Sequence, residues 1–372
     1  MGTPAITGSG VFTPPHTITN DELVAAFNAY ADRYNADHAA AIDAGRVAAK
    51  VHSSSAFIAG ASGIHQRYVM EKSGILDPEV MHPRLPPRRD DQPSLMAEMA
   101  LDACHKALAQ AGRSAREVDL IICAASNHER AYPAIAVEIQ SLLGAQGFAF
   151  DMNVACSSAT FGIKAAADMM RAGGANCAIV VSPEICSAHL EWRDRDCHFI
   201  FGDVCTAVMI EPEERAQGPH FRIHSTRCAT QFSNNIRNND GFLRRAHGQM
   251  GDRRDMQFMQ NGRRVFKEVL PLVVSHIAGH LDEAETSAST LSRLWLHQAN
   301  KGMNDFIGRK VLGRDAAPDE QPNVLQNYAN TSSAGSIIAF SQHSDDLPPG
   351  AKGMICSFGA GYSVGSVLVE RA

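Results

Sequence analysis

Cys156 occupies the position in this sequence that is best suited to covalent chemistry. An apolar, strand-like run over residues 147–154 precedes it, and a small-residue segment with helical spacing over 157–171 follows it. The sequence therefore predicts a thiol at a strand-to-helix turn, on the first positions of a helix. Free N–H groups and the positive end of the helix dipole favour a thiolate there. Because the thiolate is the nucleophilic form of cysteine, this position indicates acyl transfer.

Two later residues, His297 and Asn330, are predicted to share this kind of position. His297 ends an apolar strand-like run, and Asn330 begins another helical segment. In open α/β sheets, strand carboxyl ends and helix N-termini gather at the ligand crevice. A histidine alone is most often a surface or satisfied core residue, and an asparagine alone is often a helix cap. Three reactive residue types at three equivalent junctions favour a catalytic set.

Two other patterns are interpreted as structural or supporting. The glycine-rich segment 357–365 is followed by a strand and not by a helix, which argues against a dinucleotide-binding loop. A glycine turn between strands brings backbone N–H groups close to a substrate, so we interpret it as an oxyanion donor. His276 and His280 have helical metal-ligand spacing but lack a third ligand, so we predict a structural pair and no metal site.

Composition limits the possible classes of protein. The chain has 372 residues, of which 45% are hydrophobic and 20% charged, as in soluble globular proteins. Its net charge of −6 argues against general nucleic-acid binding, and no apolar run reaches membrane-spanning length. The start of the sequence lacks the features of a secretion signal, so we expect a cytoplasmic protein. The nine cysteines are scattered without a C-x-x-C pair, so we expect neither a disulfide framework nor a zinc site.

The elements that must position these residues alternate between strands and helices, and the alternation restarts after the acidic segment 211–219. This order predicts an α/β fold with two halves: residues 1–215 carry the cysteine, and residues 216–372 carry the histidine and asparagine. Strands are expected at 3–13, 118–125, 147–154, 178–181, 207–210, 220–226, 293–297, 352–358 and 364–369. Helices are expected at 21–46, 94–111, 134–143, 157–171, 256–281, 303–312 and 332–343.

Five sequence motifs together resemble one enzyme family nearly end to end. They are Ala155-Cys156-Ser157-Ser158, Phe201-Gly202-Asp203, His297-Gln298-Ala299-Asn300, Asn330-Thr331-Ser332 and Ser357-Phe358-Gly359-Ala360-Gly361. The chain resembles the β-ketoacyl-[acyl-carrier-protein] synthase III family, the initiating condensing enzymes of bacterial fatty-acid synthesis. The resemblance implies a thiolase-like fold, in which two similar α-β-α-β-α halves form a five-layered core, and a homodimer.

The resemblance also implies catalytic roles. Cys156 would take an acyl group from acyl-CoA. His297 and Asn330 would bind the malonyl thioester and stabilise the enolate that forms when carbon dioxide leaves. The backbone N–H groups of Cys156 and Ala360 would hold the oxyanion. Neutral donors in a dry site suit a developing enolate. No cofactor is implied, because CoA thioester and the phosphopantetheine of the acyl carrier protein are substrates.

The resemblance assigns the acyl pocket to Tyr132, which would reach into the partner subunit, and to Phe201, which would line the channel. For both residues, ordinary core packing is an equally good interpretation. At the CoA site, Phe57 and Ala61 occupy positions where the family usually has Trp and Arg. Another family arginine aligns with Gly302. Arg195 still matches a position that contacts the nucleotide, so CoA binding is expected to be weakened or rebuilt.

Two longer segments, around 25–55 and at the polar loop 227–255, resemble family members that accept medium-chain acyl-CoA, so a longer acyl channel is expected. Lys267, Arg309 and Lys310 match basic docking positions for the acidic carrier protein, and Arg263 and Arg264 lie nearby in the sequence. A local basic patch attracts an acidic partner even when the net charge is negative.

Two other functions remain open at this point. A relative from secondary metabolism with the same three residues would condense two acyl chains, or transfer an acyl group without decarboxylation. A non-catalytic subunit that pairs with an active homologue is a third possibility, and the intact set of Cys156, His297 and Asn330 argues against it. The acyl chain length and the pathway are not determined by these motifs.

Overall fold

The fold is organised around nine β-strands in a single mixed sheet, in the order β11-β12-β13-β8-β1-β7-β6-β4-β5. We analysed a computed structural model, which describes residues 2–241 and 253–372. The strands are β1 Pro4–Phe12, β4 Leu120–Ala124, β5 Phe148–Met152, β6 Ala178–Ile185, β7 Asp203–Pro212, β8 Phe221–Ser233, β11 Leu291–Leu296, β12 Lys352–Gly359 and β13 Gly361–Arg371.

The strands fall into two groups with the same internal order. The N-terminal strands run β4-β6-β7-β1, with one parallel pair followed by two antiparallel pairs. The C-terminal strands run β11-β12-β13-β8, with the same sequence of directions. β5 extends only the first group, and the groups join through two residue pairs between β1 and β8. The predicted division at 215/216 falls between β7 and β8 and stays a prediction.

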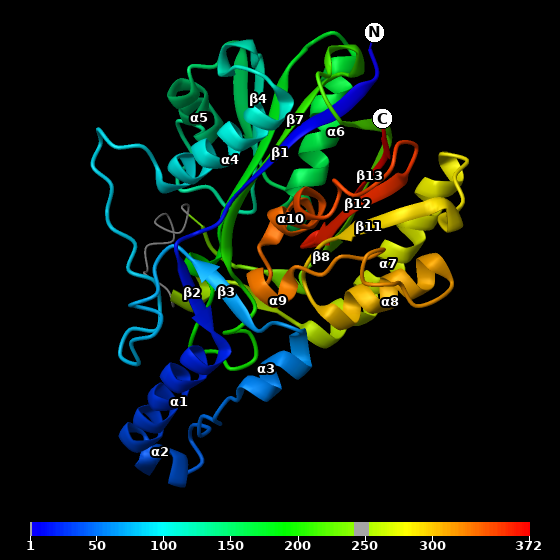
Figure 1. The fold of residues 1–372 in the computed structure, drawn as a ribbon. Helices are drawn as coiled ribbons and strands as arrows, with labels where there is room; N and C mark the ends of the chain where they lie inside the picture. Colours follow the sequence, from blue (N-terminus) through cyan, green and yellow to red (C-terminus); the bar gives the residue numbers. More distant parts are fainter. Residues whose placement is uncertain (1, 242–252) are drawn as a thin grey trace.

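Helices form three layers around the two groups of strands (Figure 1). α4 Leu95–Ala111 and α5 Ile135–Leu143 cover the outer face of the N-terminal strands. α7 Gly262–Glu283 and α8 Lys301–Leu312 cover the outer face of the C-terminal strands. α6 Ser158–Arg171 and α10 Gly335–Gln342 lie between the groups. The result is the five-layered, thiolase-like arrangement that was predicted.

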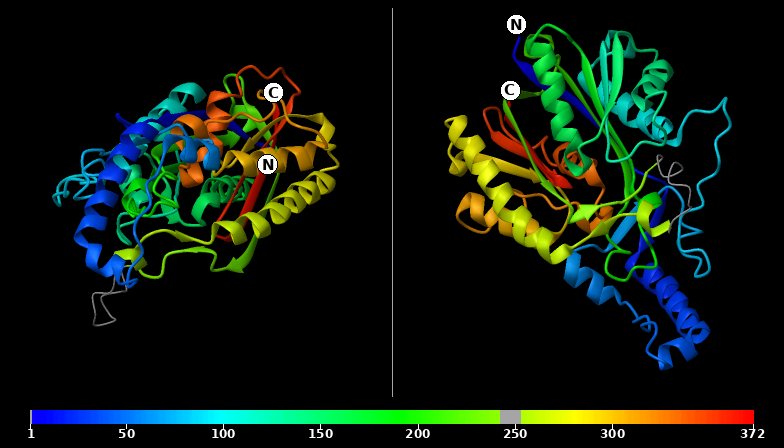
Figure 2. Two further views of the ribbon diagram at one scale, coloured as in Figure 1. Left: turned by 90° about the horizontal axis from the view of Figure 1, so that it is seen from below. Right: turned by 180° about the vertical axis from the view of Figure 1, so that it is seen from behind.

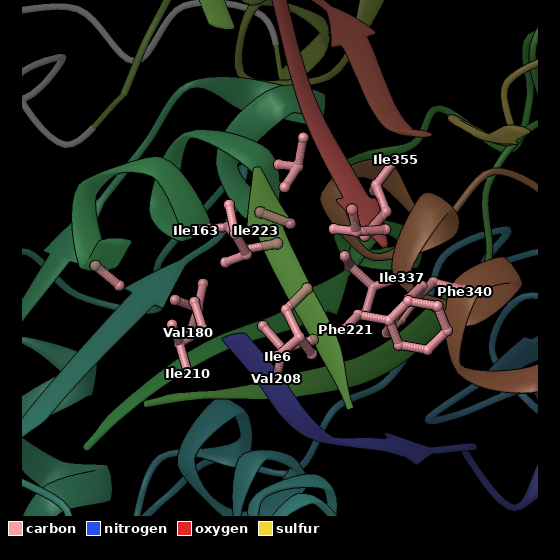
Figure 3. Close-up of a cluster of buried hydrophobic side chains, with 14 of the residues drawn as sticks. Ile6, Ile163, Val180, Val208, Ile210, Phe221, Ile223, Ile337, Phe340 and Ile355 are labelled. Carbon is pink, nitrogen blue, oxygen red and sulfur yellow. The ribbon is translucent and has the colours of Figure 1, made fainter. Parts of the chain in front are cut away.

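The central layer is held by apolar side chains from both groups of strands (Figure 3). Ile163 of α6 and Ile337 of α10 belong to one buried cluster with Val180, Phe221 and Ile355 from the flanking strands. Burial of such side chains is the main favourable term in folding. Because α6 begins two residues after Cys156 and α10 begins five residues after Asn330, this cluster also fixes the helices that follow two predicted site residues.

A smaller unit extends from the five layers, as both Figure 1 and the right view of Figure 2 show. It contains a two-stranded sheet and three short helices near the N-terminus. These elements are β2 His16–Thr19, α1 Asn20–Asp37, α2 Ala39–Asp43, α3 Ser55–Ser62 and β3 Gln66–Val69. Its own core includes Phe27, Ile58 and Trp192, which are buried. This unit lies beside the predicted CoA site.

Several predicted boundaries were wrong. The helix expected over 21–46 is two helices separated at His38, and Thr19 caps the first of them through a capping box with Glu22. The helix expected from 256 begins at Gly262, where Asn261 caps it. β8 continues to Ser233 by pairing with β13, so the first part of the predicted loop 227–255 is strand. Residues 242–252 of that loop lie outside the described residues.

Short elements that carry little periodicity were not predicted. They are β2, β3, α3, the two-residue strands β9 Ile236–Arg237 and β10 Met259–Gln260, and the helix α9 Leu325–Tyr328. Within residues 2–241 and 253–372, no helix combines the length and the apolar composition needed to cross a bilayer.

Candidate active site

Cys156 lies at the helix start where it was predicted. It is the middle residue of a 3₁₀ turn, Ala155–Ser157, that leads from β5 into α6. The Asn153 carboxamide oxygen accepts the Ala155 N–H at 2.9 Å, and Ala155 has a φ of 47°. This left-handed conformation is uncommon for a residue with a side chain. We call residues 153–157 the first turn.

Asn330 begins a second turn of the same design, which we define as residues 330–334. Its carboxamide oxygen accepts the Ser332 N–H at 2.8 Å, and Ser332 has a φ of 50°. The Asn330 side chain is buried, and its oxygen is already bonded, so its NH₂ group is the part left for a ligand. The Ser332 hydroxyl donates to the Cys156 sulfur at 3.5 Å. The two turns therefore touch at the nucleophile.

His297 directly follows β11, and its backbone N–H donates to the Cys356 carbonyl at 2.8 Å. The imidazole is 2% exposed and meets the Phe358 ring edge-on at 5.2 Å between centroids. Burial lowers its pKa to about 4. At neutral pH the ring is therefore uncharged and carries one N–H donor. Its Nδ1 atom has no hydrogen-bond partner among the residues that the structure describes.

One cavity of about 530 Å³ is lined by Cys156, His297 and Asn330 together. The three residues come from β5–α6, from the end of β11 and from the loop before α10. The structure thus brings the three predicted residues to one site. Its remaining lining is mainly apolar and includes Phe201 and Phe358, which suits a dry site for charge that develops during a reaction.

The predicted low pKa of the Cys156 thiol was wrong. Burial raises the pKa to about 11, and the Glu184 carboxyl nearby raises it further. Hydrogen bonds from Ser332 and from the backbone N–H groups of Ala360 and Cys156 act in the opposite direction. The position at a helix start does not outweigh removal of the sulfur from water. The resting residue is therefore a thiol at neutral pH.

The backbone N–H groups of Cys156 and Ala360 act on the sulfur and lower its pKa. They are the predicted oxyanion donors, and that role stays a prediction. Ala360 lies between β12 and β13, directly after Gly359. A Cβ atom at Gly359 would lie 2.9 Å from the sulfur and 2.6 Å from the Cys156 Cβ. Only glycine lets this strand end approach so closely, which places the Ala360 N–H beside the reacting atom.

A second, smaller cavity of about 120 Å³ reaches Cys156 from another side. Phe201 and Phe258 line both cavities, and their rings meet edge-on at 4.8 Å. His189 and Met256 line the smaller cavity but not the larger one. Phe201 is therefore both a buried core residue and part of the wall beside the nucleophile, so its two interpretations do not exclude each other.

Tyr132 does not line either cavity of its own chain. Its side chain is 83% exposed, in the segment before α5. The core-packing interpretation of this residue was therefore wrong. Such an exposed aromatic residue is available to another molecule.

At the far end of the larger cavity, Phe57 and Ala61 form part of the wall. The Arg195 guanidinium lies 4.1 Å from the Phe57 ring centroid, and its Nε donates to the His52 carbonyl at 2.8 Å. This cation–π pair shows that the two predicted nucleotide-contacting residues are side by side. Gly302 lies in the first turn of α8 and is not part of this wall.

The predicted docking residues divide between two helices. Lys267 is exposed on the first turns of α7, next to Arg263, which lines the larger cavity, and to the exposed ring of Phe266. Arg309 and Lys310 end α8. Arg309 forms an ion pair with Asp315 at 2.6 Å, and lines a separate depression that does not include Cys156.

Two groups of residues have metal-ligand types. His276 and His280 both bond to the Ser366 hydroxyl, at 2.9 and 2.6 Å, which explains their spacing without an ion. Cys123, His128 and Asp151 bring ligand atoms within 4.8 Å of one another. However, both Asp151 oxygens accept backbone N–H groups at the start of α5. Neither group is placed at the sulfur.

Sequence reasoning missed two residues around the nucleophile, Ser332 and Glu184. Ser332 was part of a recognised motif, but nothing in the sequence indicates its left-handed backbone or its bond to sulfur. Glu184 is a carboxyl at the end of the apolar run that became β6, and it is 1% exposed. A charged residue at the end of a buried strand was the available signal, because unpaired charges are rarely buried.

Comparisons with known proteins agree with this geometry. The family model for 3-oxoacyl-[acyl-carrier-protein] synthase III matches residues 150–231, and its C-terminal counterpart matches residues 281–371. A β-ketodecanoyl-[acyl-carrier-protein] synthase of Pseudomonas aeruginosa is 55% identical over 93% of this chain and 99% of its own. A β-ketoacyl-[acyl-carrier-protein] synthase III of Acidiphilium cryptum is 34% identical over 73% of this chain and 83% of its own.

The solved structure of 3-oxoacyl-[acyl-carrier-protein] synthase III from Aquifex aeolicus shares the fold, with a TM-score of 0.76 at 22% identity over 99% of both chains. The sequence relatives, the matched family models and the shared cavity of Cys156, His297 and Asn330 all agree. The chain therefore belongs to the β-ketoacyl-[acyl-carrier-protein] synthase III family of condensing acyltransferases.

Proposed function

We propose that this enzyme condenses a medium-chain acyl-CoA with malonyl-[acyl carrier protein] to give 3-oxoacyl-[acyl carrier protein], CoA and carbon dioxide. The observation that carries the proposal is the single cavity that Cys156, His297 and Asn330 line together. The reaction balances without an external oxidant or reductant, so we expect no redox cofactor and no metal.

In the first half-reaction, the Cys156 sulfur attacks the acyl-CoA carbonyl. The thiol proton is transferred to the departing CoA sulfur, so the products are acyl-Cys156 and CoA thiol. Because the resting thiol is protonated, a neutral base must take its proton during the attack. The uncharged His297 ring lines the same cavity and is available for this step. The N–H groups of Cys156 and Ala360 stabilise the oxyanion.

In the second half-reaction, malonyl-[acyl carrier protein] enters the larger cavity. His297 and Asn330 donate to its thioester oxygen while the carbon–carbon bond to the carboxylate breaks. The electron pair from that bond forms the enolate, and carbon dioxide leaves. The enolate carbon attacks acyl-Cys156, and the thiolate that leaves takes a proton from water, so the overall reaction consumes one proton. Two uncharged donors suit this step because they stabilise the enolate oxygen without binding the substrate carboxylate strongly.

The acyl donor is proposed to carry eight carbons. The product named for the Pseudomonas aeruginosa relative has ten carbons, and malonyl contributes two of them. The smaller cavity, with His189, Met256 and Phe258 beyond the sulfur, is the proposed position of the acyl chain.

A homodimer is proposed from the surface between residues 132 and 148. β5 is an edge strand of the sheet and begins at exposed Phe148, while exposed Val137 and Leu142 lie on the preceding helix α5 and exposed Tyr132 lies before that helix. An edge strand flanked by exposed apolar side chains favours pairing with a second copy. Pairing there would bring Tyr132 to the partner's acyl pocket. The exposed cations Arg263, Arg264 and Lys267 at the cavity mouth are the proposed contact for the carrier protein, and the cytoplasm stays the expected location.

The test is a two-step assay. The protein is mixed with octanoyl-CoA, and the acyl-enzyme is measured by intact-protein mass spectrometry. Malonyl-[acyl carrier protein] is then added, and carbon dioxide and 3-oxodecanoyl-[acyl carrier protein] are measured. We expect acylation of the wild type, no acylation of Cys156→Ala, and normal acylation of the control Cys228→Ala, because Cys228 lies outside the cavity.

Two results would contradict the proposal. Acyl-enzyme that still forms in Cys156→Ala would show that Cys156 is not the nucleophile. Release of product without carbon dioxide would instead favour the alternative of acyl transfer without decarboxylation. A panel of acyl-CoAs from two to twelve carbons then measures the chain-length preference.

A further inference from the structure

Glu184 is a buried carboxyl that binds both halves of the chain behind the nucleophile. It is the next-to-last residue of β6 and is 1% exposed. One oxygen accepts the Ser126 N–H at 2.9 Å and the Ser333 N–H and hydroxyl at 3.2 and 2.5 Å. The other oxygen accepts the Ser126 hydroxyl at 2.6 Å. Ser126 follows β4, whereas Ser333 belongs to the second turn.

These bonds continue into the first turn. The Ser126 carbonyl accepts the Asn153 side-chain NH₂ at 2.8 Å. Asn153, Ser126, Glu184 and Ser333 therefore form an unbroken chain of hydrogen bonds from one catalytic turn to the other. On the opposite side, Ser332 donates to the Cys156 sulfur. The two turns are thus joined once at the reacting atom and once behind it.

Stability alone gives no reason for a carboxyl at this place. No cation forms an ion pair with Glu184 among the residues 2–241 and 253–372. A buried carboxylate without a cation is costly even when it is hydrogen-bonded, and apolar replacements of buried charges are often neutral or stabilising. What the carboxyl supplies is geometry, because its two oxygens accept the four N–H and O–H donors of Ser126 and Ser333 and also the Cys186 thiol at 3.8 Å.

We propose that Glu184 is a positioning residue of the condensation site, which fastens the second turn to the first and so holds Asn330 and Ser332 in register with Cys156. This inference rests on the proposed condensation, in which Asn330 binds the malonyl thioester. Glu184 does not touch the substrate in this arrangement. It acts through Ser333 on the turn that carries Asn330, and through Ser126 on the turn that carries Cys156.

The charge of Glu184 also reaches the thiols around it. Its carboxylate contributes to the raised pKa values of Cys156, Cys186, Cys123 and Cys205, and Asp203 acts on Cys186 as well. Burial raises the pKa of Glu184 itself to about 7. When the carboxyl is protonated, one oxygen becomes a donor and cannot keep all four contacts. The link between the turns is therefore expected to weaken as the pH falls through about 7.

The test compares Glu184→Gln, Ser333→Ala and the double variant in the two-step assay. We expect acylation by octanoyl-CoA within about threefold of the wild type in each. We expect condensation with malonyl-[acyl carrier protein] to fall by roughly tenfold to a hundredfold, through kcat more than through KM, because the donor Asn330 is displaced but present. The double variant should be no slower than Glu184→Gln alone, since both changes break the same link.

Ser366→Ala is the matched control for loss of a buried, hydrogen-bonded serine. Its hydroxyl bonds to His276 and His280 and lies outside both cavities, so condensation should stay within about twofold of the wild type. If Glu184→Gln does not fold, Ser333→Ala still removes the short hydroxyl contact with Glu184 without changing the charge, while the backbone N–H contact at position 333 stays. Condensation at the wild-type rate in Ser333→Ala, or additive losses in the double variant, would overturn the proposal.

A second readout separates this inference from the proposed function. Alkylation of Cys156 by iodoacetamide is followed across pH without any acyl substrate. Because Glu184→Gln removes a nearby negative charge, its alkylation midpoint should move to lower pH than in the wild type. A wild type that acylates but never decarboxylates would refute the proposed condensation alone. An unmoved alkylation midpoint in Glu184→Gln would refute the coupling of Glu184 to the nucleophile.

Discussion

The first and second turns have the same backbone and different tasks. In each, an asparagine oxygen accepts the N–H two residues later, at 2.9 Å in the first and 2.8 Å in the second. In each, the third residue is left-handed, with φ values of 47° and 50°. In each, the N–H of the fifth residue donates to the carbonyl of the second residue at 3.1 Å, just before a helix of the central layer begins. The shared strand order of the two halves extends this match to the whole framework.

The difference lies in which side chain faces the cavity. The fourth residue of the first turn is Cys156, which lines both cavities, whereas its counterpart Ser333 faces Glu184. The first residue of the second turn is the buried Asn330, whereas its counterpart Asn153 is exposed. In the proposed reaction, one turn supplies the nucleophile and the other supplies the donor, so two turns of the same backbone design serve two different steps.

The largest expected effect comes from moving the thiol between the two turns. In the double variant Cys156→Ala/Ser333→Cys, the thiol occupies the equivalent backbone position but faces Glu184. We expect acyl-enzyme formation from octanoyl-CoA to fall by roughly a thousandfold or more, as for loss of a nucleophile. Intact-protein mass spectrometry measures it. Acylation of the relocated thiol at position 333 would show that the two positions are interchangeable, and it would contradict the different tasks assigned to the two turns.

The two asparagines should also differ. Asn330→Ala removes a turn bond and a donor in the cavity, so decarboxylation of malonyl-[acyl carrier protein] should fall by roughly a hundredfold to a thousandfold. Asn153→Ala removes the equivalent turn bond and the bond to the Ser126 carbonyl, but no donor in the cavity, so it should cost roughly tenfold. Carbon dioxide release by both variants measures this. Equal losses would mean that the carboxamide acts through the turn and not on the substrate.

Ser332→Ala tests the contact between the turns. Its counterpart in the first turn is already alanine, at position 155, so the left-handed backbone tolerates the change. Loss of the hydroxyl removes a hydrogen bond that lowers the pKa of Cys156. The alkylation midpoint should therefore move to higher pH, and alkylation at pH 8 should slow by roughly threefold to tenfold. Faster alkylation would mean that Ser332 blocks the sulfur.

The smallest effect concerns the outer helices that support the two halves. α7 carries His276 and His280, for each of which burial lowers the pKa to about 4, whereas the single histidine of α4, His105, is exposed. Histidines in the unfolded chain titrate near pH 6.5. Below that pH the unfolded chain therefore binds protons that the folded chain does not bind. The folded state is therefore fully stable with respect to these two histidines above about pH 6.5, and it loses stability as the pH falls toward 4.

Hydrogen exchange at pH 7.5 and pH 5 measures this difference, and α7 should lose protection before α4 does. In His276→Gln/His280→Gln, the loss of stability between these two pH values should be smaller than in the wild type. An identical pH dependence of unfolding in urea would show that these histidines do not cause the acid sensitivity.

The sequence predicted the framework better than the electrostatics. The apolar runs gave β4, β6 and β12, and the junction argument brought Cys156, His297 and Asn330 to one cavity. The prediction of a thiolate failed because the burial of a sulfur depends on residues distant in the chain, such as Phe201 and Gly359. The short strands β2 and β3 were missed because four residues carry too little periodicity for detection.

The equivalence of the two turns was also invisible in the sequence. They share an asparagine at the first position and little else, since Val154-Ala155-Cys156 stands against Thr331-Ser332-Ser333. What they share is a left-handed residue and a pair of hydrogen bonds, which several residue types can form. Glu184 was missed for a similar reason, because the two serines that join it to the turns, Ser126 and Ser333, are 58 and 149 positions away in the chain.

The Cys156 sulfur lies where the larger and the smaller cavity meet, and this arrangement sets the order in which the two substrates bind. An acyl chain attached to Cys156 can occupy the smaller cavity and leave the larger cavity free. Both pantetheine arms, however, must use the larger cavity, because His297 and Asn330 are found only there. The first thiol product must depart before the second donor can arrive. Double-reciprocal plots for the two substrates should accordingly be parallel, and free CoA should compete with the carrier-bound donor.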